Sequence, residues 1–318
     1  MVGRTSSAVT ATARVKGRRF THTLSRLGDS LYYVLHHRMG VVGVAILTFI
    51  AIMALFPQLF TPYNPTQIFE QNFAPPSPQH LCGTDYEGKD VWTQIIYGAR
   101  ASLLVGFIAT ILTIAIGGFI GVLSGYYGGF IDNVLMFFSD SLMLLPSLLL
   151  LIVFATMFRN GFIVAKLTGV GRWTLWDTAV VIALIAWPST ARMVRAQVMQ
   201  LKNRPYVEAI KIIGAGSWRI MFKHILPQTT PLLLSRITVL TPGFMVTAAS
   251  LSFLGLGDPN TPDWGYVMYT AYKNMFTVVT ENNWLWIVLP GLLLAITVMG
   301  FICVGEAIDD YLNPKRRR

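Results

Sequence analysis

Residues 204–228 read RPYVEAIKIIGAGSWRIMFKHILPQ, a polar and charged segment between two long apolar stretches. Apolar residues recur within it at helical spacing, first before Gly214 and again after Gly216. Pro205 suits the first position of one helix, and Ser217 can cap a second. The pattern predicts two short amphipathic helices joined at a glycine hinge, whose apolar faces need a protein partner.

The rest of the chain has the composition of a membrane protein. Of its 318 residues, 53% are hydrophobic and only 13% are charged. So few charges could not solvate a soluble domain, so we expect an all-α integral membrane protein. Six apolar stretches each approach the ~20 residues that a helix needs to cross a bilayer. These predicted spans are 39–61, 99–125, 131–158, 178–199, 232–254 and 284–305.

The distribution of lysine and arginine predicts how these spans are oriented. Basic residues are concentrated in 1–38, 200–229 and 307–318, whereas 62–98 and 255–283 each hold one lysine against several acids. The positive-inside bias therefore predicts that both termini and the 200–229 loop are cytoplasmic and that 62–98 is extracytoplasmic. The formal charge of +10 then marks a membrane face rather than a nucleic-acid surface. The predicted organisation is a basic tail, a first span, an outer loop, a helical core and a basic end: 1–38, 39–61, 62–98, 99–306 and 307–318.

Glycines and prolines predict how the spans pack. A glycine recurs at every fourth position near the end of the second span, at Gly117, Gly121, Gly125 and Gly129. This bare stripe lets another helix approach closely, and packing within the same subunit is favoured over a dimer seam. Prolines lie inside four other spans, at Pro146, Pro188, Pro242 and Pro290. Each predicts a bend, with or without a moving part.

No residue pattern for catalysis or metal binding occurs. The sequence contains no phosphate-binding loop, zinc-protease motif or hydrolase elbow. Cys82 lies in a polar loop and Cys303 in an apolar span, so neither a disulfide nor a metal site is expected. The acids of 85–90 lack the ligand spacing of a calcium loop, and we expect a solvated turn there. We expect no catalytic residue, no metal and no directly bound cofactor.

Asp140 is the only acid well inside a predicted span, and such a charge is by default a functional candidate. The alternative that we favour is structural, with Asp140 near the interface or paired with a serine or arginine. A single acid gives little support for an ion-coupled carrier, which needs several charges near the midplane.

Several stretches resemble one protein family. Glu208-Ala209, Gly214 and Leu226-Pro227 have the spacing of the EAA loop of ATP-binding-cassette importer permeases, with Ile210 and His224 as departures. Three more stretches resemble the peptide-importer branch: 81–98 (with Lys89 for the usual arginine), 123–129 (LSGYYGG) and 251–265 (SFLGLG…TPDWG). The resemblance covers about residues 35–313, and the chain is similar to the C-type permease subunit of dipeptide and oligopeptide importers.

The resemblance implies a type I importer transmembrane domain with six spans, in the cell membrane, without catalytic activity of its own. Its implied partners are a B-type sister permease, two cytoplasmic ATPase subunits that use ATP and Mg, and an extracytoplasmic solute-binding protein. By this resemblance Glu208 pairs with a basic group of an ATPase and Gly214 supplies the bend. The other implied coupling residues are Ala209, Trp218, Met221, Phe222, Leu226 and Pro227, of which Trp218, Met221 and Phe222 fill the apolar part of the ATPase cleft.

The cargo is left open by the sequence. Subunits with this pattern also resemble those that serve oligosaccharides, nickel or glutathione, and no residue of the apolar spans identifies a ligand. Tryptophans of the outer segments are equally well explained as interface anchors: Trp173, Trp176, Trp264, Trp284 and Trp286. An ion-coupled secondary carrier is the rival class, and it predicts midplane acids and inverted repeats that are not visible in the sequence.

Overall fold

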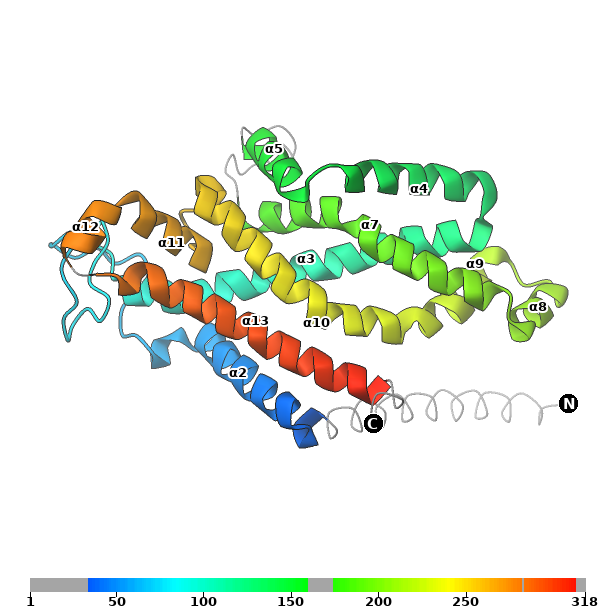
Figure 1. Cartoon of the computed structure of the whole chain (residues 1–318), viewed down its shortest axis with the longest axis horizontal. Helices are drawn as coiled ribbons and strands as arrows, with labels where there is room; N and C mark the ends of the chain where they lie inside the picture. The colour runs from blue at the N-terminus through cyan, green and yellow to red at the C-terminus, as the bar shows by residue number, and fades with distance from the viewer. Residues whose placement is uncertain (1–33, 160–173, 282, 313–318) are drawn as a thin grey trace, which may run out of the picture.

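The computed structural model describes residues 34–159, 174–281 and 283–312, and helices dominate these ranges (Figure 1). Within them, strand-like pairing is limited to isolated bridges from Ile68 to Lys89 and from Thr84 to Asp90. Five helical stretches are long and apolar enough to cross a membrane. They are α2 (Arg38–Leu55), α3 (Val91–Tyr127), α7 (Leu175–Lys202), a continuous stretch Ser217–Leu256 that contains α10 (Leu226–Leu251), and α13 (Leu285–Leu312).

The predicted third span, 131–158, is two helices rather than one. α4 (Gly129–Leu144) and α5 (Ser147–Arg159) meet at a bend of 95°, and the pair together makes a sixth candidate span. Proline lacks an N–H and disfavours helical backbone at the residue before it. Leu145, which precedes Pro146, is accordingly extended, with φ −90° and ψ 140°. The other span prolines lie within unbroken helices: Pro188, Pro242 and Pro290.

Glycines allow α3 and α7 to approach closely. A Cβ at Gly121 would stand 2.6 Å from the Ala191 carbonyl oxygen, and Cβ atoms at Gly117 and Gly125 would each stand 2.8 Å from a backbone carbonyl oxygen of α7. Because a side chain at these positions would push α7 away, the stripe sets the helix separation. The predicted packing within the subunit is confirmed for these three glycines. Gly129 does not belong to the stripe, since it begins α4 and a Cβ there would have no neighbour within 4 Å.

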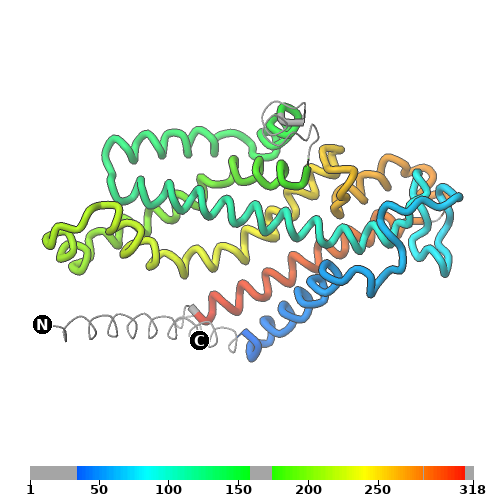
Figure 2. The backbone as a smooth tube through the Cα atoms, turned by 180° about the vertical axis from the view of Figure 1, so that it is seen from behind, coloured from blue at the N-terminus to red at the C-terminus, as the bar shows by residue number. Residues whose placement is uncertain are grey.

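α2 and α13 form a second close pair along one edge of the bundle (Figures 1 and 2). A Cβ at Gly43 of α2 would lie 2.7 Å from the Gly300 carbonyl oxygen of α13. α2 begins and α13 ends at the same end of this pair. α8 (Pro205–Ile212) lies at one end of the molecule, and α11 (Trp264–Lys273) and α12 (Met275–Thr280) lie at the other. We call these two ends the α8 end and the α11 end.

Two tryptophans are core residues of the α11 end. Trp264 has no exposed surface, and its indole N–H donates to the Ile95 carbonyl at 2.9 Å. Trp286 is 1% exposed and packs in the same apolar cluster. Their interpretation as interface anchors is therefore wrong, because both rings contribute their large apolar area to the core. Trp176 and Trp284 are exposed, and Trp173 lies outside the described residues.

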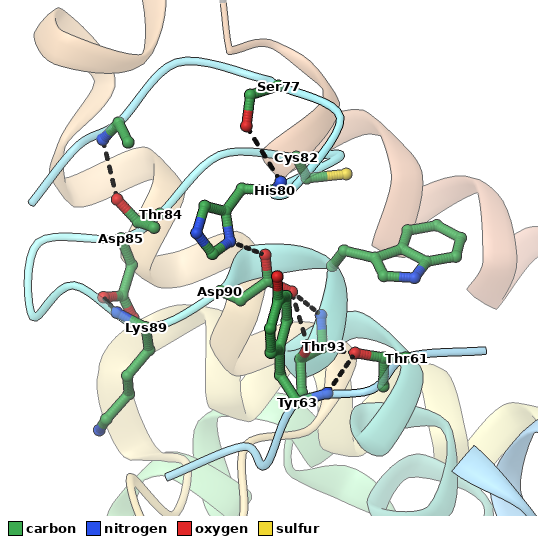
Figure 3. Close-up of polar contacts among 12 residues, drawn as sticks. Thr61, Tyr63, Ser77, His80, Cys82, Thr84, Asp85, Lys89, Asp90 and Thr93 are labelled. Carbon is green, nitrogen blue, oxygen red and sulfur yellow. Dashed lines mark hydrogen bonds and ion pairs between the residues drawn. The ribbon is translucent and has the colours of Figure 1, made fainter. Parts of the chain in front are cut away.

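The predicted solvated turn before α3 is instead an ordered turn, held by hydrogen bonds to buried carboxylates (Figure 3). Asp85 is 3% exposed, and its Oδ1 accepts the backbone N–H groups of Glu87 and Lys89 at 2.8 Å each. Its Oδ2 accepts from Gln94 Nε2 at 2.6 Å. Burial raises the pKa of Asp85 above its ordinary value, while these donors act to lower it. The turn is folded around the buried Asp85 carboxylate, whose oxygens are satisfied by protein donors rather than by solvent.

Asp90 joins this hydrogen-bonded turn to the first turn of α3. Its Oδ2 accepts from the backbone N–H and the hydroxyl of Thr93, at 2.7 and 2.6 Å, as a helix N-cap does. Its Oδ1 lies 2.8 Å from Nδ1 of His80 (Figure 3). The contact between His80 and Asp90 fixes the loop onto the start of α3, so the role of His80 here is structural.

Candidate partner-binding site

The 204–228 segment protrudes at the α8 end (Figure 1). Pro205 lies in the first turn of α8, and Arg204 before it is extended, with ψ 141°. A proline here leaves no helical hydrogen bond unmade. Val207 is the buried residue of α8. The predicted first short helix is confirmed, and Val207 is the side chain that it buries against the bundle.

Gly214 makes the turn after α8. Its φ is +84°, in the left-handed region that costs other residues roughly 1–2 kcal/mol. A Cβ at Gly214 would have no neighbour within 4 Å, so the backbone alone requires glycine. The predicted glycine break is confirmed. The predicted cap at Ser217 is wrong, because the chain enters the helix one residue earlier and the cap position falls on Gly216.

The second helix of the segment does not end at Pro227. α9 (Ser217–Arg219) continues through a π-helical stretch, η2 (Ile220–Ile225), directly into α10. The Leu226 N–H bonds to the Met221 carbonyl five residues back, which is the wider π pattern. Pro227 then lies in the first turn of α10, where a proline is tolerated. The predicted span 232–254 is therefore the later part of one long helical stretch.

Met221 faces the bundle rather than the surface. Its side chain is fully buried in an apolar cluster with Val207 of α8 and Val198 of α7. The helical spacing identified an apolar face, but this part of it packs on the protein's own helices. Met221 therefore holds the segment in place and is not exposed to a partner in this conformation.

Trp218 and Phe222 lie on the open side of the segment. Trp218 is 60% exposed, and its ring centroid is 4.3 Å from that of Phe222. The Phe119 ring of α3 supports Phe222 at a centroid distance of 6.0 Å. The aromatic pair is thus supported by Phe119 on one side, while Trp218 is accessible on the other, as a docking surface requires.

The outward side of α8 combines an acid with bare apolar side chains. Glu208 and Ala209 are exposed, and the Glu208 carboxylate forms no hydrogen bond or ion pair with other described residues. Ile212 and Ile213 are 86% and 84% exposed. The sequence pattern did not single out Ile212; its signal is a pair of β-branched residues next to the helix-breaking Gly214. Leu226 is partly buried and Pro227 exposed at the far side of the segment.

Polar contacts hold α8 in position. The amide of Gln228 donates to the hydroxyl of Tyr206 at 2.7 Å, which ties α8 to the start of α10. The Lys211 ammonium lies 5.5 Å from the centre of the Tyr126 ring, at cation–π distance. The first contact joins α8 to α10, and the second joins it to α3.

Asp140 is paired with an arginine, as predicted. Arg192 Nη2 of α7 donates to Asp140 Oδ1 of α4. The two side chains are 44% and 59% exposed, respectively. Across the described ranges, no cluster of three or more histidine, cysteine or acidic side chains could hold a metal ion.

These features define a class of protein, a helical membrane protein with a short helix at one end that exposes acidic and apolar side chains. The chain belongs to the family described as binding-protein-dependent transport system inner membrane component, whose model matches residues 117–318. Residues 25–76 match the N-terminal transmembrane domain of oligopeptide transport permease C. The resemblance found in the sequence is confirmed.

Curated relatives match nearly the whole chain. A dipeptide transport system permease protein of Haemophilus influenzae is 33% identical over 92% of this chain and 96% of that protein. An oligopeptide transport system permease protein of Bacillus subtilis is 33% identical over 93% of this chain and 92% of its own length. A glutathione transport system permease protein of Pectobacterium atrosepticum is 31% identical over 89% of each.

A solved structure supports the fold. A chain of the inward-facing MetNI methionine ABC transporter is 19% identical, with a TM-score of 0.50, over 68% of this chain and 96% of that one. At this identity the likeness concerns the arrangement of helices alone.

Proposed function

We propose that the chain is the permease subunit of an ATP-driven importer, forms half of its route for peptides, and is coupled to cytoplasmic ATPases through the 204–228 segment. Family membership and the dipeptide and oligopeptide permeases among its relatives support this proposal. The observation that carries it is the outward side of α8, where Glu208 is unpaired beside the bare Ile212 and Ile213. Adjacent exposed apolar side chains beside a charge are typical of a surface that binds a partner.

We further propose that the subunit lies in the cell membrane with both termini and the α8 end in the cytoplasm. The charge pattern supports this orientation, since 200–229 is basic and 62–98 is acidic. α2 beginning and α13 ending at the same end is consistent with an even number of crossings, six when the bent pair is one span.

The proposed assembly has four kinds of partner: a B-type sister permease, two cytoplasmic ATPase subunits, an extracytoplasmic solute-binding protein and the lipid bilayer. ATP and Mg are used by the ATPases, and this chain provides no catalytic group. Closure of the ATPases moves α8, and the helices fixed to it repack between two arrangements that differ by only a few kcal/mol. In this proposal Glu208 pairs with a basic group of the ATPase, while Ile212, Ile213 and the Trp218–Phe222 pair fill its apolar cleft.

Other cargoes fit the same importer design. The glutathione permease relative supports glutathione as an alternative cargo, and oligosaccharides and nickel remain candidates from the sequence resemblance. An ion-coupled carrier is less well supported, because the intramembrane acid Asp140 is already paired with Arg192.

Two substitutions test the coupling role. Glu208→Lys reverses the free charge of α8, and Gly214→Val imposes a β-branched residue at a φ of +84°. We expect both to abolish peptide uptake in whole cells while the subunit is still inserted and still binds its sister permease. Glu281→Lys, an equivalent charge reversal at the α11 end, is the matched control and is expected to retain uptake. Normal uptake by both variants would exclude this role for α8.

Purification tests the protein class. A tagged chain is expected to co-elute with two ATPase subunits and a sister permease. Transport by the chain alone in proteoliposomes would instead establish a stand-alone carrier.

A further inference from the structure

Three charged side chains form a strip across α4, α7 and α10. Asp140 of α4 pairs with Arg192 of α7, and Arg236 of α10 donates through Nη2 to Ser189 of α7 at 3.3 Å. Ser189 and Arg192 are three residues apart on α7 and so share one face of the helix. The strip is therefore continuous from Asp140 to Arg236.

The strip lies well inside the helices. Asp140 is 11 residues from the start of α4, and Arg236 is 10 residues from the start of α10. Arg192 is 10 residues before the end of α7. At 1.5 Å of rise per residue, Asp140 and Arg192 lie on the order of 15 Å from the α8 ends of α4 and α7. Arg236 lies on the order of 15 Å beyond the start of α10, which itself continues the helical stretch that begins at Ser217. This depth places the charges within the hydrocarbon layer if the helices span it.

Arg236 is the member of the strip whose guanidinium has no carboxylate partner among the described residues. A guanidinium carries five N–H donors, and the bond to Ser189 is long and goes to a neutral hydroxyl. Its Nε is enclosed without a hydrogen-bond partner among the described residues, although the side chain is partly accessible. By contrast, Arg192 and Arg195 on α7 each bind a carboxylate. The strip therefore carries one uncompensated positive charge.

Lipid is a poor environment for this strip. Arg192 and Asp140 are 44% and 59% exposed, and a charge facing hydrocarbon costs several kcal/mol. Charged groups at this depth instead face water or protein, and they mark transport routes. In a subunit that forms half of a route, this face borders the route.

We propose that Arg236 is a binding site for the carboxylate of the cargo on the translocation route. The inference rests on the proposed import of peptides, which carry a terminal carboxylate when they are linear and unmodified. A carboxylate accepts two parallel N–H donors from a guanidinium, which satisfies the donors that Ser189 leaves free. The neighbouring Asp140–Arg192 pair is neutral overall, so it leaves the charge of Arg236 available for an anion.

A protection experiment tests this site. In the full complex in inside-out vesicles, Cys82 and Cys303 are replaced by serine and a reporter thiol is introduced by Ser189→Cys, next to Arg236. The rate of its modification by a membrane-impermeant methanethiosulfonate is measured with a free-acid peptide and with the same peptide amidated at its C-terminus. We expect the free acid at ten times its half-protecting concentration to slow modification about tenfold, and the amide to have little effect.

The second variant removes the guanidinium. Adding Arg236→Gln is expected to abolish protection by the free acid, whereas Arg236→Lys retains part of it. Arg100→Gln, an exposed arginine of α3 outside the strip, is the matched control and retains full protection.

Three results would overturn the proposal. They are equal protection by acid and amide, no protection by either, and no modification at all, the last meaning that lipid or the sister permease seals this face. Peptide uptake by the unmodified complex is measured in parallel. Absent uptake rejects the proposed cargo, whereas normal uptake without acid-specific protection rejects only the role of Arg236.

Discussion

Arg195 of α7 binds Asp132 of α4 through two parallel hydrogen bonds, from Nε to Oδ1 and from Nη2 to Oδ2, each 2.6 Å long. Asp132 is 6% exposed and also accepts from the hydroxyl of Ser124 in α3. One carboxylate therefore joins three helices at the α8 end. It fixes the ends of α3, α4 and α7 relative to one another.

Asp132→Asn tests this junction. Asparagine has one acceptor oxygen and a donor NH2 in place of the two carboxylate oxygens, so it cannot accept the two parallel bonds. Arg195 loses its bidentate partner, and the free energy of unfolding falls by about 1–3 kcal/mol. The melting temperature of the purified complex in detergent measures the effect. Asp140→Asn is the comparison, and its ion pair is largely exposed, so we expect a smaller decrease. Equal decreases in the melting temperature of the two variants would mean that the burial of Asp132 does not strengthen its ion pair with Arg195.

The glycine stripe gives a prediction with opposite signs at neighbouring positions. A Cβ at Gly121 meets the Ala191 carbonyl at 2.6 Å, whereas the nearest atom to a Cβ at Gly118 is 3.9 Å away. Gly121→Ala is therefore expected to destabilise by about 1–3 kcal/mol through overpacking. Gly118→Ala is expected to be neutral or to stabilise by up to about 1 kcal/mol, because alanine favours helix. Melting of both variants decides, and the same sign for both would contradict the packing of α3 on α7.

Local patterns were enough to predict the class and most of the helices. The length of an apolar stretch predicts a span and the charge of a loop predicts its side of the membrane, and both are read from residues close together in the sequence. The regular spacing of Gly117, Gly121 and Gly125 likewise indicates, without knowledge of the partner helix, that a helix packs closely there. Pro146 shows the limit of this reasoning. All four span prolines lack the same N–H, but the chain turns by 95° only at Pro146, while Pro188, Pro242 and Pro290 lie within unbroken helices.

Residue burial was harder to predict, because it depends on distant segments. Met221 and Trp218 belong to the same amphipathic pattern, but α7 covers one and leaves the other open. Trp264 is buried because it meets Ile95, 169 residues away in the chain. Asp85 becomes a buried carboxylate because its own turn and Gln94 supply the donors. Spacing within one element cannot specify such contacts.

Cys82 is predicted to be an unreactive thiol. It is 2% exposed, and burial, aided by the charge of Asp90, raises its pKa to about 12. Since the thiolate is the nucleophile, only about one thiol in ten thousand is reactive at pH 8. In a Cys303→Ser background, we expect maleimide labelling of Cys82 to be slow in the folded complex and complete within minutes in denaturant. Fast labelling of the folded complex at pH 8 would show that the loop opens.

Asp263 is expected to make stability depend on pH. It caps α11, accepting from the Tyr266 N–H at 2.8 Å and the Ser252 hydroxyl at 2.9 Å, and burial raises its pKa to about 6. A carboxyl whose pKa is higher in the folded state stabilises the fold in its protonated form. That contribution is complete below about pH 4, the pKa of an unfolded aspartate, and is lost as the pH rises through 6.

Asp263→Asn isolates this effect. Asparagine keeps the oxygen that caps the helix but cannot ionise, so the variant gains on the unmodified protein between pH 4.5 and 7.5. The gain in unfolding free energy is on the order of 2–3 kcal/mol. Melting curves of both proteins across this range measure it, and the difference between them cancels the titration of all other groups. Parallel curves would mean that Asp263 stays ionised in the folded protein, with Ser252 and the Tyr266 N–H fully offsetting its burial.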